Sequence, residues 1–207
     1  TVLAREIRKK IKDRTGLNAS AGISINKFIA KIASDINKPN GQKTIPPEDV
    51  IDFLETLDIR KFHGVGKVTQ EKMYGLGIFT GVDLKLKTLE YLQDHFGKSG
   101  LHYFNVVRGV HLSDVKPTRI RKSLGAERTF SKNISSEIYM LEKLEDIAEE
   151  VERRLKGSRV AGKTITLKLK TSDFNIQTRS KTLKIFISSK ALIMEETKAL
   201  LFQEPVK

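Results

Sequence analysis

The chain has 207 residues, of which 39% are hydrophobic and 30% charged, and its formal net charge is +13. It contains no cysteine, which excludes a disulfide framework and a thiolate metal site, and no apolar run approaches the ~20 residues of a membrane span. The positive charge favours an anionic partner, most commonly nucleic acid, and the composition fits a cytoplasmic protein. The chain begins with Thr1 and enters a charged amphipathic helix at once, so we expect a fragment or a processed chain without a signal peptide.

Hydrophobic spacing in the first half of the chain predicts the end of an α/β layer followed by short helices. The last turn of the first helix is marked by a glycine, and the second helix starts at an asparagine N-cap. The expected elements are a helix to Gly16, a strand within 17–24, a helix from Asn26, a strand at 42–45, and helices from 47 to about 110.

The second half changes to the alternating pattern of half-exposed strands from Thr118 onward. The expected elements are a strand at 118–127, a helix at 135–156, strands at 164–170 and 183–187, and a helix at 189–202. Strand–helix–strand–strand–helix is a split βαβ pattern that lacks one strand. Residues 115–118 are the best linker candidate.

The segment 31–41 carries the most specific signal. Apolar residues at helical spacing follow Asn26, and Pro39 and Gly41 then end the helix. Lys38 is left beside a turn, where a lysine can reach a ligand. This Lys-Pro-Asn-Gly turn after a helix resembles the Y-family DNA polymerases of the DNA polymerase IV type, in which the lysine contacts the triphosphate of the incoming nucleotide. The resemblance implies that Lys38 binds nucleotide.

A second motif, Phe62-His63-Gly64-Val65-Gly66-Lys67, predicts a helix-hairpin-helix. Glycines let the backbone approach a phosphate, and the N–H groups at the start of the next helix then face the anion. Such contacts grip the DNA backbone and read no sequence. The family has this motif in its thumb, often with proline in place of His63. The predicted DNA-binding residues here are Gly64, Val65, Gly66, Lys67 and Thr69.

A third signal is a basic sheet face. Thr164, Thr166, Lys168 and Lys170 alternate with apolar residues, and a solvated basic face can lie along duplex phosphates. Arg121-Lys122-Ser123-Leu124-Gly125 resembles the first strand of the little-finger domain of Y-family polymerases. The predicted DNA-binding residues in this part are Arg119, Arg121, Lys122, Ser123, Lys168 and Lys170.

Other sequence patterns that could indicate a catalytic or metal-binding site do not match. Gly97-Lys98-Ser99 lacks the preceding glycine of a phosphate-binding loop, because position 92 is leucine. The four histidines show no metal-ligand spacing. Paired acids such as Glu149-Glu150 fall on predicted helix surfaces. We therefore assign no catalytic and no metal-binding residue.

These motifs occur in the order found in Y-family polymerases, and the resemblance implies an α+β multidomain fold. It places the C-terminal part of a palm at 1–45, an all-helical thumb at 46–112, a linker at 113–120, and a split βαβ little finger at 121–207 without its last strand. The resemblance implies a translesion DNA polymerase that adds nucleotides to a primer end in DNA repair and damage tolerance.

By the same resemblance the partners are primer-template DNA and a deoxynucleoside triphosphate, with a sliding clamp as a further partner of the intact protein. The cofactor would be Mg²⁺, whose carboxylate ligands are expected upstream of Thr1, so we expect the chain alone to be inactive. A non-catalytic DNA-binding module remains the alternative. An RNA-binding split βαβ protein would instead carry stacking aromatics on the sheet, where 164–170 shows threonines and lysines.

Overall fold

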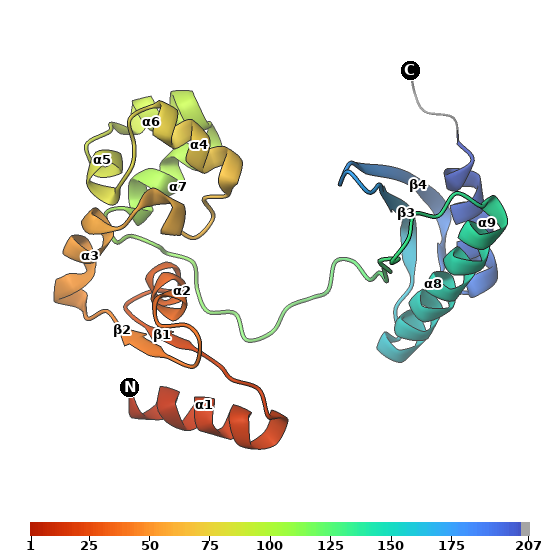
Figure 1. Cartoon of the computed structure of the whole chain (residues 1–207), viewed down its shortest axis with the longest axis horizontal. Helices are drawn as coiled ribbons and strands as arrows, with labels where there is room; N and C mark the ends of the chain where they lie inside the picture. Colours follow the sequence, from red (N-terminus) through yellow and green to blue (C-terminus); the bar gives the residue numbers. More distant parts are fainter. Residues whose placement is uncertain (204–207) are drawn as a thin grey trace. The chain divides into compact units, whose positions relative to one another are not determined.

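The computed structural model describes residues 1–203, and these form two compact units that are described separately, one of residues Thr1–Pro117 and one that begins at Thr118 (Figure 1). The elements of the first unit are α1 (Val2–Thr15), β1 (Ala21–Ile23), α2 (Lys27–Ile36), β2 (Gln42–Thr44), η1 (Pro47–Asp49), α3 (Val50–Thr56), η2 (Ile59–Lys61), α4 (Lys67–Gly75), α5 (Gly81–Lys85), α6 (Leu89–Phe96) and α7 (Lys98–Val106).

The second predicted helix, α2, forms as its sequence dictates. The Asn26 side chain accepts a hydrogen bond from the Ile29 N–H and caps the helix. Phe28, Ile29 and Ile32 then fall on one buried face, which is the apolar stripe that the spacing predicts.

The small sheet beneath α2 is parallel, with β1 paired to β2 and Ala21 opposite Gln42. α1 ends at Gly16, whose φ of 72° closes the helix in the left-handed conformation. Its apolar stripe is largely exposed, since Val2 and Leu3 keep 65% and 68% of their surface. The helix therefore follows its predicted bounds without burying its apolar face against the described residues.

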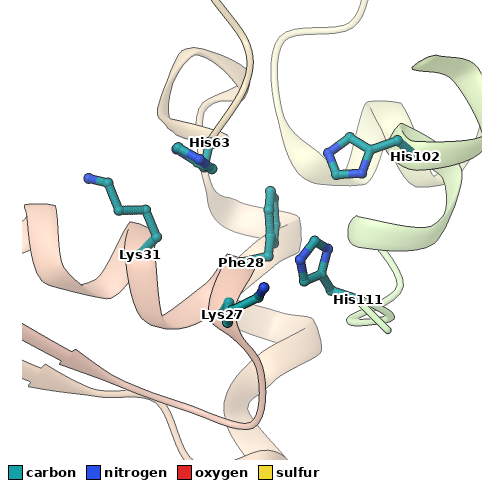
Figure 2. Close-up of a pocket in the computed structure, with 6 residues that line it drawn as sticks. All are labelled: Lys27, Phe28, Lys31, His63, His102 and His111. Carbon is teal, nitrogen blue, oxygen red and sulfur yellow. The ribbon is translucent and has the colours of Figure 1, made fainter. Parts of the chain in front are cut away.

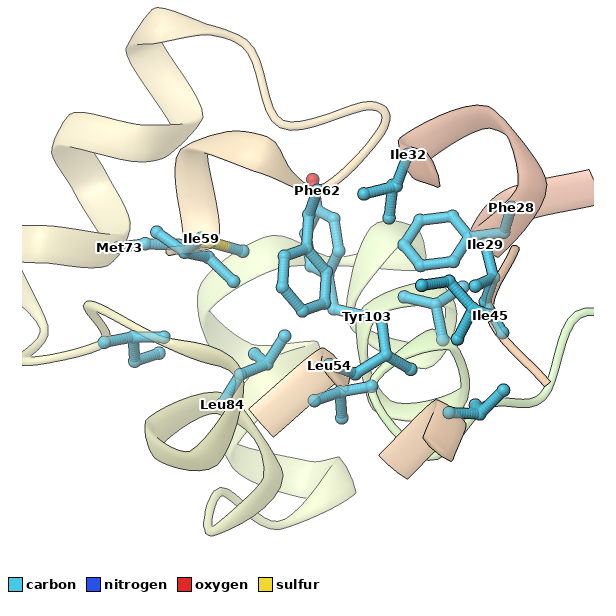
Figure 3. Close-up of a cluster of buried hydrophobic side chains, with 14 of the residues drawn as sticks. Phe28, Ile29, Ile32, Ile45, Leu54, Ile59, Phe62, Met73, Leu84 and Tyr103 are labelled. Carbon is cyan, nitrogen blue, oxygen red and sulfur yellow. The ribbon is translucent and has the colours of Figure 1, made fainter. Parts of the chain in front are cut away.

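The first unit has one hydrophobic core that joins α2 to the helices that follow it (Figure 3). Phe28 and Ile32 of α2 meet Phe62, and the ring centroids of Phe28 and Phe62 lie 5.9 Å apart. Leu54 and Met73 are fully buried in the same cluster. The predicted palm and thumb segments thus share one core, and the division between them at 45/46 stays a prediction.

The second unit is a two-stranded antiparallel sheet packed against two helices. The strands are β3 (Gly162–Lys170) and β4 (Ile176–Ile187), and the helices are α8 (Glu137–Ser158) and α9 (Lys190–Leu201). Ala148 and Leu155 of α8, Ile187 of β4 and Ile193 of α9 form its core. The helices and strands predicted between 135 and 202 are all present, and all but one lie within a few residues of their expected bounds. The exception is β4, which begins at Ile176, seven residues before the strand predicted at 183–187.

The strand predicted at 118–127 does not form. Among the described residues, this segment pairs with neither β3 nor β4 and has no regular secondary structure. Leu124 packs against the core of the second unit, but Ile120 keeps 91% of its surface exposed. The polar and apolar residues alternate here, but the apolar ones make only a few side-chain contacts and the backbone forms no hydrogen-bonded ladder. Residues 204–207 of the predicted little finger lie outside the described residues.

None of the helices within residues 1–203 combines the length and the apolar character that crossing a membrane would require.

Candidate nucleic-acid interface

Lys38 lies one residue beyond the C-cap of α2 and is joined to Pro39 by a cis peptide bond. Its side chain is 56% exposed, and its ammonium pairs with the Asp35 carboxylate. Hydrogen bonds from Lys31 and Lys38 lower the pKa of Asp35. Lys38 therefore presents its cation to solvent beside the turn, held only by an exposed ion pair of the kind that contributes little to stability.

The turn after Lys38 is fixed by contacts that the sequence did not reveal. A Cβ at Gly41 would lie 1.7 Å from the carbonyl oxygen of Asn37, so only glycine fits there. The Arg8 guanidinium, from α1, donates to Asn40 Oδ1 at 2.9 Å and to the carbonyl of Ala19 at 2.9 Å. Arg8 is 32 residues from Asn40 and looks like any other charge on an amphipathic helix, so no local pattern identifies it.

The predicted helix-hairpin-helix is formed by η2, a loop at 62–66 and α4. Gly64 has a φ of +96°, whereas Gly66 has an ordinary φ of −83° and is the N-cap of α4. The Val65 N–H donates to the Phe62 carbonyl at 3.0 Å, which closes the loop. A Cβ at either glycine would meet nothing within 4 Å, so the backbone of this loop is open to a ligand.

The start of α4 carries the features of an anion site. Gly66 has no side chain with which to cap the helix, and the first helical bond is donated by Gln70 to the Gly66 carbonyl at 2.9 Å. The N–H groups of Lys67, Val68 and Thr69 precede it and point out of the helix end. The side chain of Lys67 is 87% exposed and adds a cation there.

Packing holds the hairpin rigid. Phe62 is 2% exposed in the core. The Asp58 carboxylate accepts from the Arg60 N–H and from the Tyr74 hydroxyl, each at 2.9 Å. Burial and this hydrogen bond raise the pKa of Tyr74, so the hydroxyl remains a donor. The loop is thus tied at both ends to α4 and η2.

In the second unit the polar face of the sheet forms as predicted. Thr164 lies opposite Thr182 with their hydroxyls 2.9 Å apart, and Thr166 lies opposite Ser180 at 2.8 Å. Lys168 and Lys170 extend this exposed face.

Both lysines have partners that the sequence did not suggest. Lys168 pairs with the Glu127 carboxylate, and the Lys170 ammonium lies 4.1 Å from the centroid of the Phe174 ring. The face therefore carries hydroxyls and partly compensated cations.

The remaining predicted contacts lie on irregular backbone. Arg119, Arg121, Lys122 and Ser123 are exposed in the segment that forms no strand. Arg121 Nη1 is 3.4 Å from Ser158 Oγ, at the end of α8. The structure thus groups Gly64 to Thr69 into one loop and helix start, and Lys168 and Lys170 on one strand, whereas residues 119–123 share no face with β3.

Three family patterns match this chain in order. They are the impB/mucB/samB family at residues 1–35, the IMS family HHH motif at 47–78, and the impB/mucB/samB family C-terminal domain at 121–206. The second pattern covers the loop with Gly64 and Gly66 and confirms the helix-hairpin-helix prediction.

Curated relatives are similar over most of the chain. DNA polymerase IV 2 of Agrobacterium fabrum is 51% identical over 201 residues, which are 97% of this chain and 56% of that protein. DNA polymerase IV of Leptospira interrogans serogroup Icterohaemorrhagiae is 51% identical over 181 residues, 87% of this chain and 50% of the relative. The chain thus spans about half the length of the curated relatives it matches.

A solved structure, described as Y-family DNA polymerase chimera Dbh-Dpo4(243-245)-Dbh, matches with a TM-score of 0.80 and 29% identity, over 97% of this chain and 57% of that one. This neighbour and the helix-hairpin-helix pattern support the predicted α+β multidomain fold. With three family patterns in order and relatives at 51% identity, the chain belongs to the Y family of DNA polymerases and is of the DNA polymerase IV type.

Proposed function

We propose that this chain is the DNA-gripping and nucleotide-contacting part of a translesion DNA polymerase, which adds nucleotides to a primer 3′ end opposite intact or damaged template bases. The observation that carries the proposal is the hairpin loop, where Gly64 and Gly66 leave open backbone beside the uncapped start of α4. Such a site takes a phosphate of duplex DNA without reading its sequence. Curated relatives named DNA polymerase IV supply the polymerase part of the proposal.

The proposed roles follow the predicted segments: the end of the palm at 1–45, the thumb at 46–112, the linker at 113–120 and the little finger at 121–207. Primer-template DNA contacts the hairpin and the polar face of β3, and Lys38 meets the triphosphate. A sliding clamp is a partner proposed for a protein that contains this chain, on the resemblance alone.

The family implies a divalent metal, which we take to be Mg²⁺. Among residues 1–203, no group of three or more His, Asp or Glu side chains gathers as a metal site would require. The described residues therefore do not fit the metal, and its carboxylate ligands would have to come from elsewhere in a longer protein. Residues of this chain would bind DNA and nucleotide around that site.

A non-catalytic DNA-binding module is the second reading. It explains the net charge of +13 and the hairpin, but it gives no role to Lys38, exposed beside a turn that Arg8 and Gly41 hold in shape. A polymerase uses that cation for the triphosphate, which is why we favour the enzyme.

The test is to mix the purified chain with primer-template DNA, Mg²⁺ and deoxynucleoside triphosphates. We expect binding that weakens steeply with salt, with a log–log slope of about −0.9 per phosphate neutralised, and no primer extension. Affinity that does not change with salt would contradict phosphate gripping. Metal-dependent extension would show that the chain contains a catalytic centre that we have not assigned.

A further inference from the structure

A basic hollow lies beside the hairpin loop, within the first unit (Figure 2). Its volume is about 380 Å³. Helix α2, the hairpin loop, helix α7 and the segment after α7 each contribute to its wall. The lining residues are Lys27, Phe28, Lys31, His63, His102 and His111.

The aromatic rings in the hollow are packed against one another. Phe28 is 3% exposed and forms the floor. Its ring centroid lies 6.0 Å from that of His102 and 6.1 Å from that of His111, and the two imidazoles are 6.1 Å apart. His102 and His111 are thus held against the buried Phe28 ring, while His63, distant from them in sequence, faces them from the hairpin loop.

The lysines are positioned at the edge of the hollow. Lys27 Nζ donates to Ser113 Oγ at 2.9 Å and to the backbone carbonyl of Asp114. Lys31 Nζ pairs with the Asp35 carboxylate at 2.5 Å. Asp35 is the one carboxylate joined to a lining residue through an ion pair in the described part of the chain.

The chemistry of the lining fits an anion. It offers ammonium and imidazole N–H donors and no carboxylate. A cation would be repelled by the two lysines, and across residues 1–203 no group of three His, Asp or Glu side chains has metal-binding geometry. Burial, followed by the charges of His111 and His63, lowers the pKa of His102, so this imidazole takes up a proton less readily than an ordinary histidine.

We propose that the hollow binds a backbone phosphate of duplex DNA next to the phosphate held by the hairpin, and that the bound phosphate favours protonation of His102. His63 links the two sites, because it belongs to the same loop as Gly64. The inference rests on the proposed DNA-binding function and adds to it a second phosphate subsite with a dependence on pH.

The direction of that dependence follows from linkage. A phosphate within reach of His102 favours the imidazolium and raises its pKa. Binding therefore takes up protons, and DNA affinity increases as the pH falls through the range in which His102 becomes protonated. The groups that face His102 are Lys27, Lys31, His63 and His111. We assign the pH dependence to His102.

The first test needs no substitution. Histidine NMR signals of the full 207-residue chain are titrated with pH alone, with inorganic pyrophosphate, and with a short duplex. We expect the duplex to raise the pKa of His102, and we expect adding duplex at constant pH not to shift the signal of His95, on α6. A rise with pyrophosphate but not with duplex would mean a site for free phosphate and would overturn the proposal, as would no rise with either.

The second test uses variants at constant ionic strength. We expect His102→Gln to weaken duplex binding about tenfold near pH 6 and to have no effect near pH 8, where the imidazole is neutral. His95→Gln is the matched control, since His95 lies outside the hollow, against Tyr91. Equal affinities of His102→Gln and His95→Gln near pH 6 would overturn the proposal. Thermal unfolding of each variant checks that it is folded.

Gly66→Leu separates this inference from the proposed function. If Gly66→Leu abolishes duplex binding and His102→Gln does not weaken it near pH 6, the hairpin grips DNA and the second subsite is wrong. If neither weakens binding, the proposed function itself fails, because neither part of the loop region then meets DNA.

Discussion

Lys38 is the residue whose chemistry separates a nucleotide-binding enzyme from a DNA-binding module. In a polymerase that contains this chain, Lys38→Ala removes a charge-assisted contact with the triphosphate, worth about 1.5–3 kcal/mol. We expect nucleotide kcat/KM to fall roughly 10- to 150-fold and primer-template affinity to stay the same. Steady-state nucleotide titration beside a DNA-binding assay measures both.

Lys9→Ala is the control for Lys38→Ala. Lys9 is also exposed and also pairs with an aspartate, Asp13, at 2.7 Å. It should leave nucleotide kinetics unchanged. If Lys38→Ala behaves like Lys9→Ala, Lys38 is only a solvated cation at a helix end, whose loss costs a few tenths of a kcal/mol.

We expect Glu150 on α8 to make the stability of the second unit depend on pH. Hydrogen bonds from Arg153 and Arg154 lower the pKa of Glu150 from 4.5 to about 2. Because the pKa of Glu150 is lower in the folded state than in the unfolded state, its carboxylate stabilises the fold at pH values above about 4.5. This stabilisation is lost as the pH falls from about 4.5 toward 2. Urea unfolding followed on α8 amide signals should therefore show weaker acid sensitivity for Glu150→Gln over this range. Glu142→Gln, exposed on the same helix, should match the parent; identical acid sensitivity in both variants would contradict the prediction.

The hairpin is the element on which DNA binding depends. Gly66 has an ordinary φ and open space around it, so Gly66→Leu should fold but block the approach of a phosphate to the start of α4. We expect at least about a tenfold loss of affinity, equal for two unrelated duplexes. Gly75→Leu, at the other end of α4 and also in open space, should bind normally. A loss confined to one duplex sequence would point to base reading and against the hairpin grip.

On the polar sheet face, one substitution should tighten duplex binding instead of weakening it. Glu127 compensates Lys168, and this ion pair lowers the pKa of Glu127. Glu127→Gln should release the lysine and tighten duplex binding about two- to threefold, within the range of an exposed ion pair. Glu195→Gln, an acid-to-amide change on α9, serves as the control, and fluorescence anisotropy measures both. Weaker binding by Glu127→Gln would mean that β3 does not face DNA.

Elements set by local rules were predictable from the sequence. Asn26, Pro39 and Gly41 gave the bounds of α2, because caps and stops act within a few residues. The strand expected at 118–127 was wrong because alternation shows that one face is half-buried but not that a partner strand exists. Ile120 is 91% exposed, so the apolar residues of this segment are not all buried on one face.

Contacts between distant segments could not be predicted. The hydrogen bond from Arg8 to Asn40 joins residues 32 positions apart in the sequence. His63, His102 and His111 show no metal-ligand spacing in the sequence, and only folding brings them into one hollow. The site residues that the sequence predicts come from short motifs or from alternation along one strand, and their roles stay predictions.

For the whole molecule, charge matters more than any single contact. A net charge of +13 is spread over two compact units, and each carries its own proposed phosphate-binding surface. Steering toward DNA by such a charge does not require a fixed arrangement of the units. The central claim is therefore that the uncapped end of α4 and the polar face of β3 meet the DNA backbone.

Hydrogen exchange of the chain with and without primer-template DNA tests this claim most directly. The amide hydrogens of Lys67, Val68 and Thr69 have no carbonyl within α4 to bind and should exchange quickly in the free chain. The account predicts that saturating DNA slows their exchange, because a phosphate oxygen becomes their acceptor, while amides in the middle of α8 do not change. Unchanged exchange at Lys67, Val68 and Thr69 in a chain saturated with DNA would contradict it.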